Sequence, residues 1–247
     1  MKLSVVIPSY NEMGNLRKGT LDKVATYLSR EKYNYEVIVV DDGSTDGSRE
    51  FVGRFIERNN KFKLIENSHT GKAGAVTKGM LEATGDYILF TDMDQATPIE
   101  EVEKLLEFVP EYDIVIGSRN TQRRGSPLIR IFISRSAIVM RKVLVGLRDI
   151  DDTQCGFKLF SKQAAKEIFE KVKEINNGFH SIKSSSVTSG FDVELLYIGS
   201  SLGYKIKEVP VDWLYVETRR VNPVRDSIEG TMDLVRIRGN ITKGKYD

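Results

Sequence analysis

The sequence predicts an α/β protein in which helices flank a mainly parallel central sheet. In the first 117 residues, short apolar runs alternate with segments whose apolar residues recur at helical spacing. Strands that alternate with helices need crossover connections and therefore run parallel. Ligands bind at the carboxyl ends of such strands. Polar clusters follow three of the apolar runs, at Pro8–Glu12, Asp41–Asp46 and Asp92–Gln95.

The apolar runs are short, as is typical of strands buried on both faces of a sheet. The first run is closed by Pro8, and the second ends in two aspartates and a glycine. We expect the strands of the first half at Leu3–Ile7, Tyr35–Val40, Phe62–Ile65, Tyr87–Thr91 and Asp113–Gly117.

The helices of the first half are expected between these strands. Apolar residues recur at helical spacing from Leu16 to Leu28 and from Phe51 to Ile56. A third helix follows the glycines of 70–79 and ends near Gly85. Thr97 and Glu100 form a capping box for the fourth helix, with Pro98 at its first position.

The second half of the chain has a less regular pattern. We expect an edge strand at Lys205–Trp213, because Pro210 would interrupt a central ladder. Neither a linker nor an internal repeat divides the chain, so residues 1–247 are expected to form one domain. The other expected elements are a long basic helix at Pro127–Leu147, a loop at Asn176–Gly190, and helices at Phe191–Leu202 and Pro223–Arg238.

Composition excludes several classes of protein. The chain has 37 Lys and Arg against 35 Asp and Glu, a net charge of +2, whereas a general nucleic-acid binder is strongly basic. A single cysteine, Cys155, excludes an internal disulfide framework and a multi-cysteine metal site. We expect Cys155 to be a packing residue and His69 a polar loop residue.

Asp92, Asp94 and Gln95 directly follow an expected strand and are candidate metal ligands. In an extended segment Asp92 and Asp94 point to the same side. Carboxylate and amide oxygens suit Mg²⁺ or Mn²⁺, and such a cation stabilises a pyrophosphate leaving group. The alternative is a polar turn with Asp94 near the start of a helix.

The cluster Asp41–Asp46 has two interpretations. Gly43 permits a tight turn, and Ser44 or Asp46 can cap the next helix. The functional alternative assigns Asp41 or Asp42 to a nucleotide base or ribose, since a carboxylate at a strand end can accept hydrogen bonds from a ribose diol. Further along, Lys72 lies in a glycine-containing segment and could meet a phosphate, although the spacing excludes a nucleotide-hydrolase P-loop.

Positive charge gathers in one stretch of the chain. Between Ile114 and Arg148 there are eight basic residues and no acidic one. Combined with the isoleucines around it, this stretch is typical of a surface that meets anionic lipid headgroups. The alternative is a solvated helix face.

Five ordered motifs carry a family resemblance. With them the chain resembles the inverting family 2 glycosyltransferases over about residues 3–240. Within that family it is similar to polyprenyl-phosphate hexose synthases, to the dolichyl-phosphate β-glucosyltransferases first and the dolichyl-phosphate mannosyltransferases next. The resemblance implies a Rossmann-like GT-A fold. The motifs are VVIPSYNE, VVDDGSTD, GDYILFTDMDQATP, DTQCGFKLF and GFDVELL.

The resemblance implies a division of labour within the single domain. About residues 1–117 would bind the nucleotide sugar, and about 118–247 would bind the acceptor. Pro8, Tyr10, Glu12 and Asp42 would hold the base and ribose, and Asp92, Asp94 and Gln95 the metal and diphosphate. The acceptor phosphate would be bound by Arg119, Arg130 and Ser134. Asp192 matches the acidic position that acts as a base in relatives with hydroxyl acceptors. Near the C-terminus, Arg219 and Arg220 would close over the diphosphate.

The implied reaction transfers a hexose, from UDP-glucose ahead of GDP-mannose, to dolichyl or another polyprenyl phosphate with inversion. The implied setting is protein glycosylation at the cytoplasmic face of a membrane. The sequence contains neither the C-terminal membrane helices nor the N-terminal anchor of many relatives, so we expect peripheral contact or a membrane partner protein. Two alternatives are a family 2 transferase with a saccharide or protein hydroxyl acceptor, and a non-catalytic module that binds nucleotide sugars.

Overall fold

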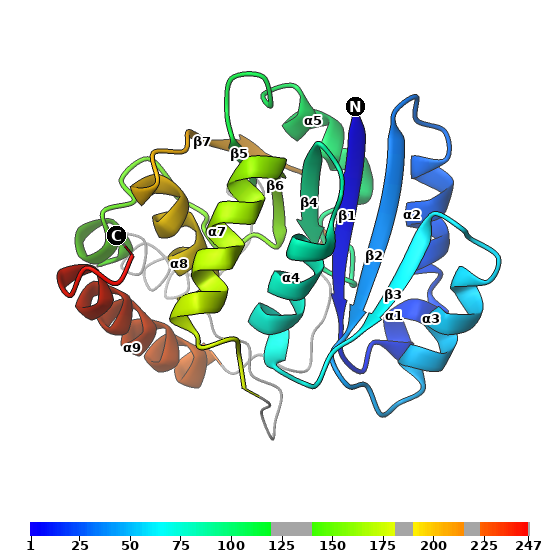
Figure 1. The fold of residues 1–247 in the computed structure, drawn as a ribbon, viewed down its shortest axis with the longest axis horizontal. Coiled ribbons are helices and arrows are strands. Elements are labelled where there is room, and N and C mark those ends of the chain that lie inside the picture. The colour runs from blue at the N-terminus through cyan, green and yellow to red at the C-terminus, as the bar shows by residue number, and fades with distance from the viewer. Residues whose placement is uncertain (120–139, 181–189, 215–222, 247) are drawn as a thin grey trace.

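The computed structural model describes residues 1–119, 140–180, 190–214 and 223–246. Its centre is a seven-stranded sheet with the order β3-β2-β1-β4-β6-β5-β7 (Figure 1). Every adjacent pair is parallel except the two that involve β6, which runs antiparallel to both β4 and β5. The predicted α/β architecture with a mainly parallel sheet is therefore confirmed. The strands are β1 Lys2–Ser9, β2 Asn34–Asp41, β3 Phe62–Glu66, β4 Tyr87–Thr91, β5 Ile114–Ser118, β6 Phe157–Ser161 and β7 Ile206–Pro210.

Helices cover both faces of the sheet. On one face the hydrophobic cluster includes residues of α4, α7, α8 and α9, with α9 packed on α8, and α4 and α7 lie in front of the strands in Figure 1. The other face packs against α1, α2, α3 and α5. The helices are α1 Met13–Arg17, α2 Thr20–Leu28, α3 Ser48–Ile56, α4 Gly71–Glu82, the 3₁₀ helix η1 Ile99–Glu101, α5 Val102–Leu106, α7 Lys162–Ile175, α8 Gly190–Ser201 and α9 Pro223–Thr242.

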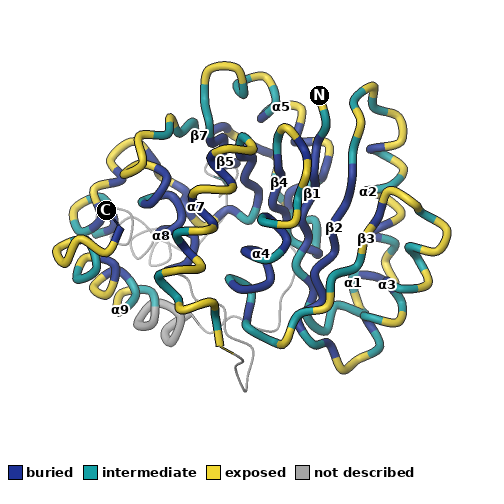
Figure 2. The backbone as a smooth tube through the Cα atoms, viewed as in Figure 1, coloured by how far each residue is buried: buried dark blue, intermediate teal, exposed yellow. Residues whose placement is uncertain are grey.

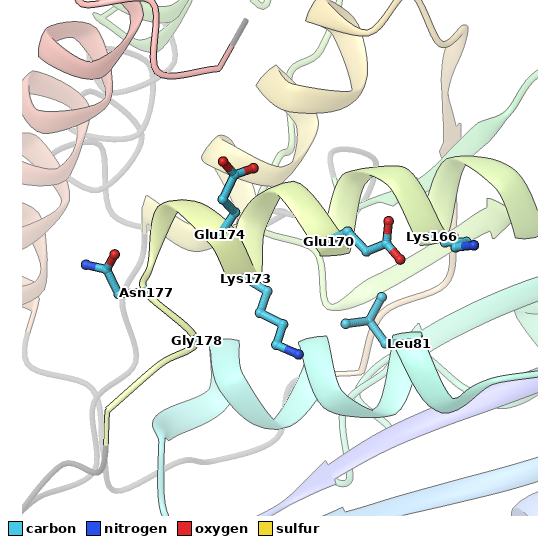
Figure 3. Close-up of a pocket in the computed structure, with 7 residues that line it drawn as sticks. All are labelled: Leu81, Lys166, Glu170, Lys173, Glu174, Asn177 and Gly178. Carbon is cyan, nitrogen blue, oxygen red and sulfur yellow. The ribbon is translucent and has the colours of Figure 1, made fainter.

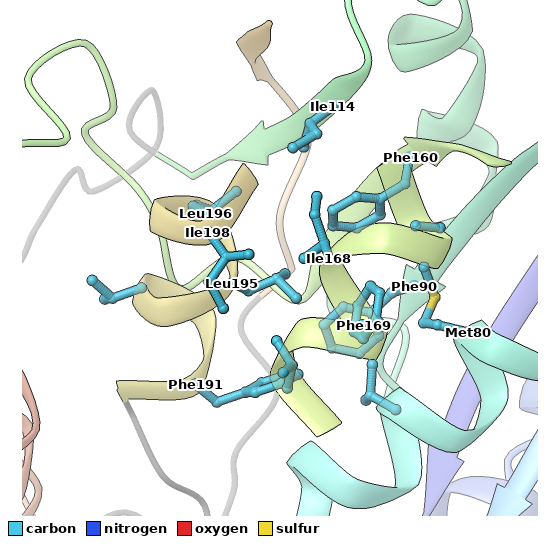
Figure 4. Close-up of a cluster of buried hydrophobic side chains, with 14 of the residues drawn as sticks. Met80, Phe90, Ile114, Phe160, Ile168, Phe169, Phe191, Leu195, Leu196 and Ile198 are labelled. Atoms are coloured by element: carbon cyan, nitrogen blue, oxygen red, sulfur yellow. The ribbon is translucent and has the colours of Figure 1, made fainter. Parts of the chain in front are cut away.

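Alternation along the strands divides the core into two layers. In β1, Leu3, Val5 and Ile7 belong to one layer and Val6 to the other, and all four are fully buried. The strands form the buried centre in Figure 2, and the exposed positions lie on the outer helices and loops. Figure 4 shows the layer between the sheet and α4, α7 and α8. In this layer the rings of Phe160 and Phe169 pack edge to face, with their centroids 5.6 Å apart.

Several sequence expectations differ from the structure. The strand β6 and the helix α7 after it were not predicted, although Ser161 accepts a hydrogen bond from the Ala164 N–H at the start of α7. The predicted capping box is wrong, because Thr97 is buried with its Oγ1 3.9 Å from Cys155 Sγ, and Pro98 lies before η1. Of the expected helix at 127–147, only 140–145 is helical within the described residues.

The remaining elements of the second half follow the expectations closely. β7 lies at the edge of the sheet, as predicted, but it ends at Pro210 rather than at Trp213. α8 is buried on nearly all sides, which explains its uniformly apolar sequence around Asp192 and Glu194. Among the described residues, no helix combines the length and the hydropathy that crossing a bilayer requires.

The close approach of α4 to the sheet depends on Gly79. A Cβ atom at this position would lie 2.4 Å from Val6 Cγ1 and 2.8 Å from Val40 Cγ2, both in fully buried β-strand residues. The contact brings the amino end of α4 to the carboxyl edge of the sheet. No larger residue fits there without moving the helix.

We expect Gly79→Ala to lower the free energy of unfolding by about 2 kcal/mol, because the clash outweighs the gain in helix propensity. Gly53→Ala is the matched control, since apart from its chain neighbours and its own helix backbone no atom of the described residues lies within 4 Å of a Cβ at that position in α3. It should raise stability by about 0.5–1 kcal/mol. Urea unfolding measures both, and equal stability of the two variants would contradict close packing at Gly79.

Candidate functional site

The polar clusters converge at the carboxyl edge of the sheet. β1 is paired with β2 on one side and with β4 on the other, and the strand order reverses there. Ligands of open α/β sheets bind at such a switch point. The loops after β1 and β2 are joined directly, because the Asn11 N–H donates to Ser44 Oγ at 3.0 Å and the Thr45 N–H to Asn11 Oδ1 at 2.8 Å.

Asp41 and Asp42 have different surroundings. Asp41 Oδ2 accepts hydrogen bonds from the Gly43 and Ser44 N–H groups, and its Oδ1 is buried without a partner in the described structure. Asp42 accepts from the Thr70 and Gly71 N–H groups, each at 2.8 Å. Asp42 thus anchors the loop that begins α4. Its role toward a nucleotide stays a prediction, as does that of Asp41.

The predicted cap of the next helix is wrong, because the N-cap residue of α3 is Gly47 and no N-cap side chain makes a capping hydrogen bond there. Asp46 Oδ1 accepts from the Ser48 N–H at 3.0 Å, at the start of α3. Ser44 does not cap that helix and accepts from Asn11 instead. Both side chains therefore hold the loops at the strand ends in place.

The ring of Tyr10 stacks on that of His69, with centroids 4.3 Å apart and planes 22° apart. His69 Nδ1 lies 2.8 Å from the Asp42 carbonyl oxygen and 3.2 Å from Asp42 Oδ2. Because both neighbours are acceptors, the Nδ1 atom carries the proton. His69 is therefore part of the structured strand-end cluster. From the sequence, His69 was expected only to be a polar loop residue.

Lys72 and Asp92 form an ion pair, with Nζ and Oδ1 2.7 Å apart. Burial lowers the pKa of Lys72, but Asp92 and Asp192 outweigh it, and the net pKa is raised. Gly156 makes room for Asp92, since a Cβ atom there would lie within 1.9 Å of Asp92 Oδ2. The lysine predicted to meet a phosphate therefore lies against the first candidate metal ligand.

Asp94 and Gln95 complete the candidate metal site. Burial raises the pKa of Asp94 and Asp92 raises it further, with partial opposition from the Ala96 N–H and Lys72. Gln95 Oε1 is buried without a hydrogen-bond partner in the described structure. Two carboxylates and an unpaired amide oxygen fit a hard divalent cation. The expected extended geometry is wrong, however, because a turn follows β4 with the Gln95 N–H donating to the Asp92 carbonyl at 3.2 Å.

A buried ion pair between Lys158 and Asp192 lies beside this site. Lys158 Nζ is 2.5 Å from Asp192 Oδ1 and donates to the Cys155 carbonyl at 2.6 Å. The lysine is fully buried, and the Asp192 side chain is 11% exposed. The sequence marked Asp192 but not Lys158, because Lys158 lies in the unpredicted strand β6. A signal was present, since lysine is rarely buried within an apolar run such as FKLF.

Arg119 is held by Asp152 in a two-point contact. Its Nε is 2.7 Å from Asp152 Oδ2, and its second guanidinium nitrogen is 2.8 Å from Oδ1. Burial alone would lower the pKa of Arg119, but Asp152 outweighs it and raises that pKa. Burial likewise opposes the ionised Asp152, yet Arg119 lowers the net pKa of Asp152. The guanidinium carbon also lies 5.9 Å from the Trp213 ring centroid.

Arg141 holds the two residues that flank Asp152. Its guanidinium donates to Thr153 Oγ1 at 2.8 Å and to the Asp151 carbonyl at 2.6 Å, on either side of Asp152. Glu208 accepts from the Asp152 N–H at 2.9 Å. The 151–153 segment is thus fixed on both sides. The sequence counted Arg141 only as one charge in the basic stretch.

The other predicted site residues are placed as follows. Pro8 lies near the end of β1, beyond the Val6–Phe90 register at which pairing with β4 ends. Glu12 Oε2 accepts from Asn15 Nδ2 at 2.6 Å at the start of α1. Cys155 is buried, and burial raises the pKa of its thiol, as expected of a packing residue. Four predicted site residues lie outside the described residues: Arg130, Ser134, Arg219 and Arg220.

A separate pocket of about 480 Å³ lies between α4 and α7 (Figure 3). Its lining includes none of the predicted site residues, and four of its side chains are charged residues of α7. We assign no chemistry to it. The pocket is lined by Leu81, Lys166, Glu170, Lys173, Glu174, Asn177 and Gly178.

The chain is similar to known proteins in its sequence and in its fold. The profile described as glycosyl transferase family 2 matches residues 4–169. The chain is 33% identical to a dolichyl-phosphate β-glucosyltransferase of Dictyostelium discoideum, over 96% of this chain and 73% of the relative. It is also 33% identical to one of Saccharomyces cerevisiae, over 99% of this chain and 76% of the relative.

A solved structure has the same fold. The mannosyltransferase of Pyrobaculum calidifontis, in complex with GDP-Man and Mn²⁺, superposes with a TM-score of 0.63 at 20% identity. The match covers 98% of this chain and 64% of the mannosyltransferase.

We expect Asp152→Asn to lower the free energy of unfolding by about 3 kcal/mol at pH 7, because Arg119 would lose its buried counter-ion. Since the folded-state pKa of Asp152 is lowered from 3.8, its stabilisation is present above that pH and is lost as the pH falls through the folded pKa. The difference between wild type and Asp152→Asn should therefore shrink below about pH 4. Urea unfolding across this pH range measures it.

Asp151→Asn is the control for this experiment. Asp151 is the neighbouring carboxylate, is 51% exposed and pairs with Lys142. Its loss should cost less than about 1 kcal/mol, as for other surface ion pairs. An equally small cost for Asp152→Asn would contradict the role given to the Arg119–Asp152 pair.

Proposed function

The chain belongs to glycosyl transferase family 2, and we propose that it transfers a glucosyl group from UDP-glucose to dolichyl or another polyprenyl phosphate, with inversion. The observation that carries the proposal is 33% identity, over 96–99% of this chain, to relatives named dolichyl-phosphate β-glucosyltransferase. The arrangement of charges at the sheet edge supports it, since both substrates of such a reaction are anionic.

The donor would lie across the carboxyl ends of β1 and β4. Tyr10 and His69 offer aromatic surface near the end of β1, where the base would bind. Asp92, Asp94 and Gln95 would hold Mg²⁺ or Mn²⁺, and that cation would neutralise charge on the departing nucleoside diphosphate. Lys72 carries a fixed positive charge beside the same carboxylates and would contact the diphosphate.

The acceptor would enter from the side of Arg119. A phosphate monoester is already largely ionised near neutral pH, with a second pKa of about 6, so it needs positioning more than proton removal. Arg119 would supply charge from its remaining guanidinium edge, because two of its nitrogens are held by Asp152. Arg130 and Ser134 would complete the phosphate site, and Arg219 and Arg220 would contact the leaving group. A phosphate oxygen bonds to the anomeric carbon as the bond from that carbon to the nucleoside diphosphate breaks.

A donor and acceptor panel tests this proposal. We expect transfer from UDP-glucose to a short polyprenyl phosphate in the presence of Mg²⁺ or Mn²⁺, with loss on chelation. Asp94→Ala should lower kcat by about 10²–10³-fold, because charge stabilisation of the leaving group is lost. Glu111→Gln, an exposed carboxylate outside the site, is the control.

Each of the other outcomes of the panel would indicate a different function. Transfer from GDP-mannose alone would indicate a dolichyl-phosphate mannosyltransferase. Transfer to a saccharide hydroxyl but not to a lipid phosphate would indicate a hydroxyl-acceptor enzyme, with Asp192 as its base. Donor binding with no transfer to any acceptor would indicate a binding module and would refute the proposed function.

We also propose that the chain contacts a membrane peripherally or through a partner protein, on the cytoplasmic face. The basic stretch from Ile114 to Arg148 supports this, as does the apolar character of an acceptor lipid. We expect sedimentation with liposomes that contain anionic lipid, weakening as salt is raised, because screening reduces headgroup attraction. Failure to sediment at low salt, with uncharged liposomes as the control, would contradict direct peripheral attachment.

A further inference from the structure

We propose that Lys158 is a positioning residue that fixes Asp192, so that the second carboxylate oxygen of Asp192 accepts a hydrogen bond from a hydroxyl of the donor hexose. The inference rests on the proposed function, because it concerns the sugar that the enzyme transfers. No motif assigned a role to Lys158. The Lys158–Asp192 pair is buried, anchored on both sides and placed beside the candidate metal ligands.

Lys158 has no access to solvent, so its ammonium acts only through its neighbours. It donates to Asp192 Oδ1 at 2.5 Å and to the Cys155 carbonyl at 2.6 Å. Its Nζ also lies 5.6 Å from the centroid of the Phe90 ring. These three contacts restrict the position of the ammonium. Asp192 Oδ1 is therefore held at a fixed point.

Asp192 itself lies on a helix that is anchored from two sides. The Gly190 N–H donates to Asp233 Oδ2 of α9 at 2.9 Å, one turn or less from Asp192. Glu194 accepts from the Tyr246 hydroxyl at 2.5 Å near the end of the chain. The first turn of α8 therefore has little freedom to shift. Within the described structure, Asp192 Oδ2 has no hydrogen-bond partner, and the side chain keeps 11% exposure.

The pair lies beside the expected diphosphate position. Because β6 is antiparallel to β4, Lys158 is in register with Phe90, two residues before Asp92. Lys72 Nζ lies 5.2 Å from the centroid of the same Phe90 ring and pairs with Asp92. The Phe90 ring thus contacts both lysines. The hexose attached to the diphosphate would lie within reach of Asp192.

Charge balance indicates which ligand Asp192 can accept. Lys158 already neutralises Asp192, whereas at the metal candidates a single lysine, Lys72, faces two carboxylates, Asp92 and Asp94. A second cation at Asp192 Oδ2 would leave net positive charge in a buried place. A neutral hydroxyl donor needs no counter-charge and forms a strong hydrogen bond to a carboxylate. The geometry therefore favours a sugar hydroxyl over a metal ion.

The test compares binding of the nucleotide sugar with binding of its nucleoside diphosphate. Titration calorimetry in the presence of Mg²⁺ would measure the Kd of the nucleotide-sugar donor selected by the panel above and the Kd of its nucleoside diphosphate. The proteins compared are wild type, Lys158→Met, Lys158→Arg, Asp192→Asn and the double variant Lys158→Met/Asp192→Asn. We expect the diphosphate Kd to stay within about 2-fold of wild type. The ratio of donor Kd to diphosphate Kd should rise about 10-fold in Lys158→Met and Asp192→Asn, because one charge-assisted hydrogen bond is lost.

The other variants separate positioning from folding. The double variant should show the same rise as either single variant, since Lys158 acts through Asp192. Lys158→Arg should recover part of the ratio. Lys63→Met is the control, because it removes a lysine from an ion pair with Glu36 at the opposite edge of the sheet. Its ratio should match that of wild type.

Two results would overturn the inference. In the first, the ratio stays at the wild-type value in Lys158→Met and Asp192→Asn. In the second, Lys158→Met loses diphosphate binding and thermal stability, and the double variant regains both and has the wild-type ratio of Kd values. That result would show that Lys158 only balances the buried charge of Asp192. Because binding is measured without an acceptor, failure of transfer to a lipid phosphate would count against the proposed function alone.

Discussion

The ion pair between Lys158 and Asp192 joins the sheet to α8 at the point where the charged groups of the site meet. Burying either charge alone would cost several kcal/mol, so the two elements that carry them must meet in one arrangement. That arrangement requires β6 to run antiparallel between β4 and β5, which places Lys158 opposite Phe90. Gly156, the residue directly before that strand, lies against Asp92. The metal candidates and the Asp192 region are therefore positioned by one strand.

Three other carboxylates at the carboxyl edge of the sheet are also held by partners. Asp42 is satisfied by the backbone at the start of α4, Asp92 by Lys72, and Asp152 by Arg119. Such pairing holds side chains in place before any ligand arrives. A site that stabilises anionic substrates gains from this, because charges that are already oriented need no reorganisation during the reaction.

Much of the fold and part of the site could be predicted from local patterns. Most strands and helices through residue 118 were predicted because apolar runs and helical spacing are local signals, although the helix expected over 16–28 is divided into α1 and α2. Asp92 and Asp94 were singled out by their position after a strand, and Lys72 by the glycines around it. The capping box at Thr97 failed because Cys155, distant in sequence, holds that side chain in the core. β6 was missed because an antiparallel strand inserted from the second half breaks the alternation on which the prediction depended.

The sequence by itself determined the α/β class, the polar strand ends, the family and the uneven distribution of charge. Each of these depends on residues close together in the chain or on ordered motifs. Only the tertiary structure decided which side chains meet: Lys158 with Asp192, Arg119 with Asp152, and His69 with Tyr10 and Asp42. The physical reason is that pairing of buried charges is set by strand order and direction, which bring together residues separated by tens of positions in sequence.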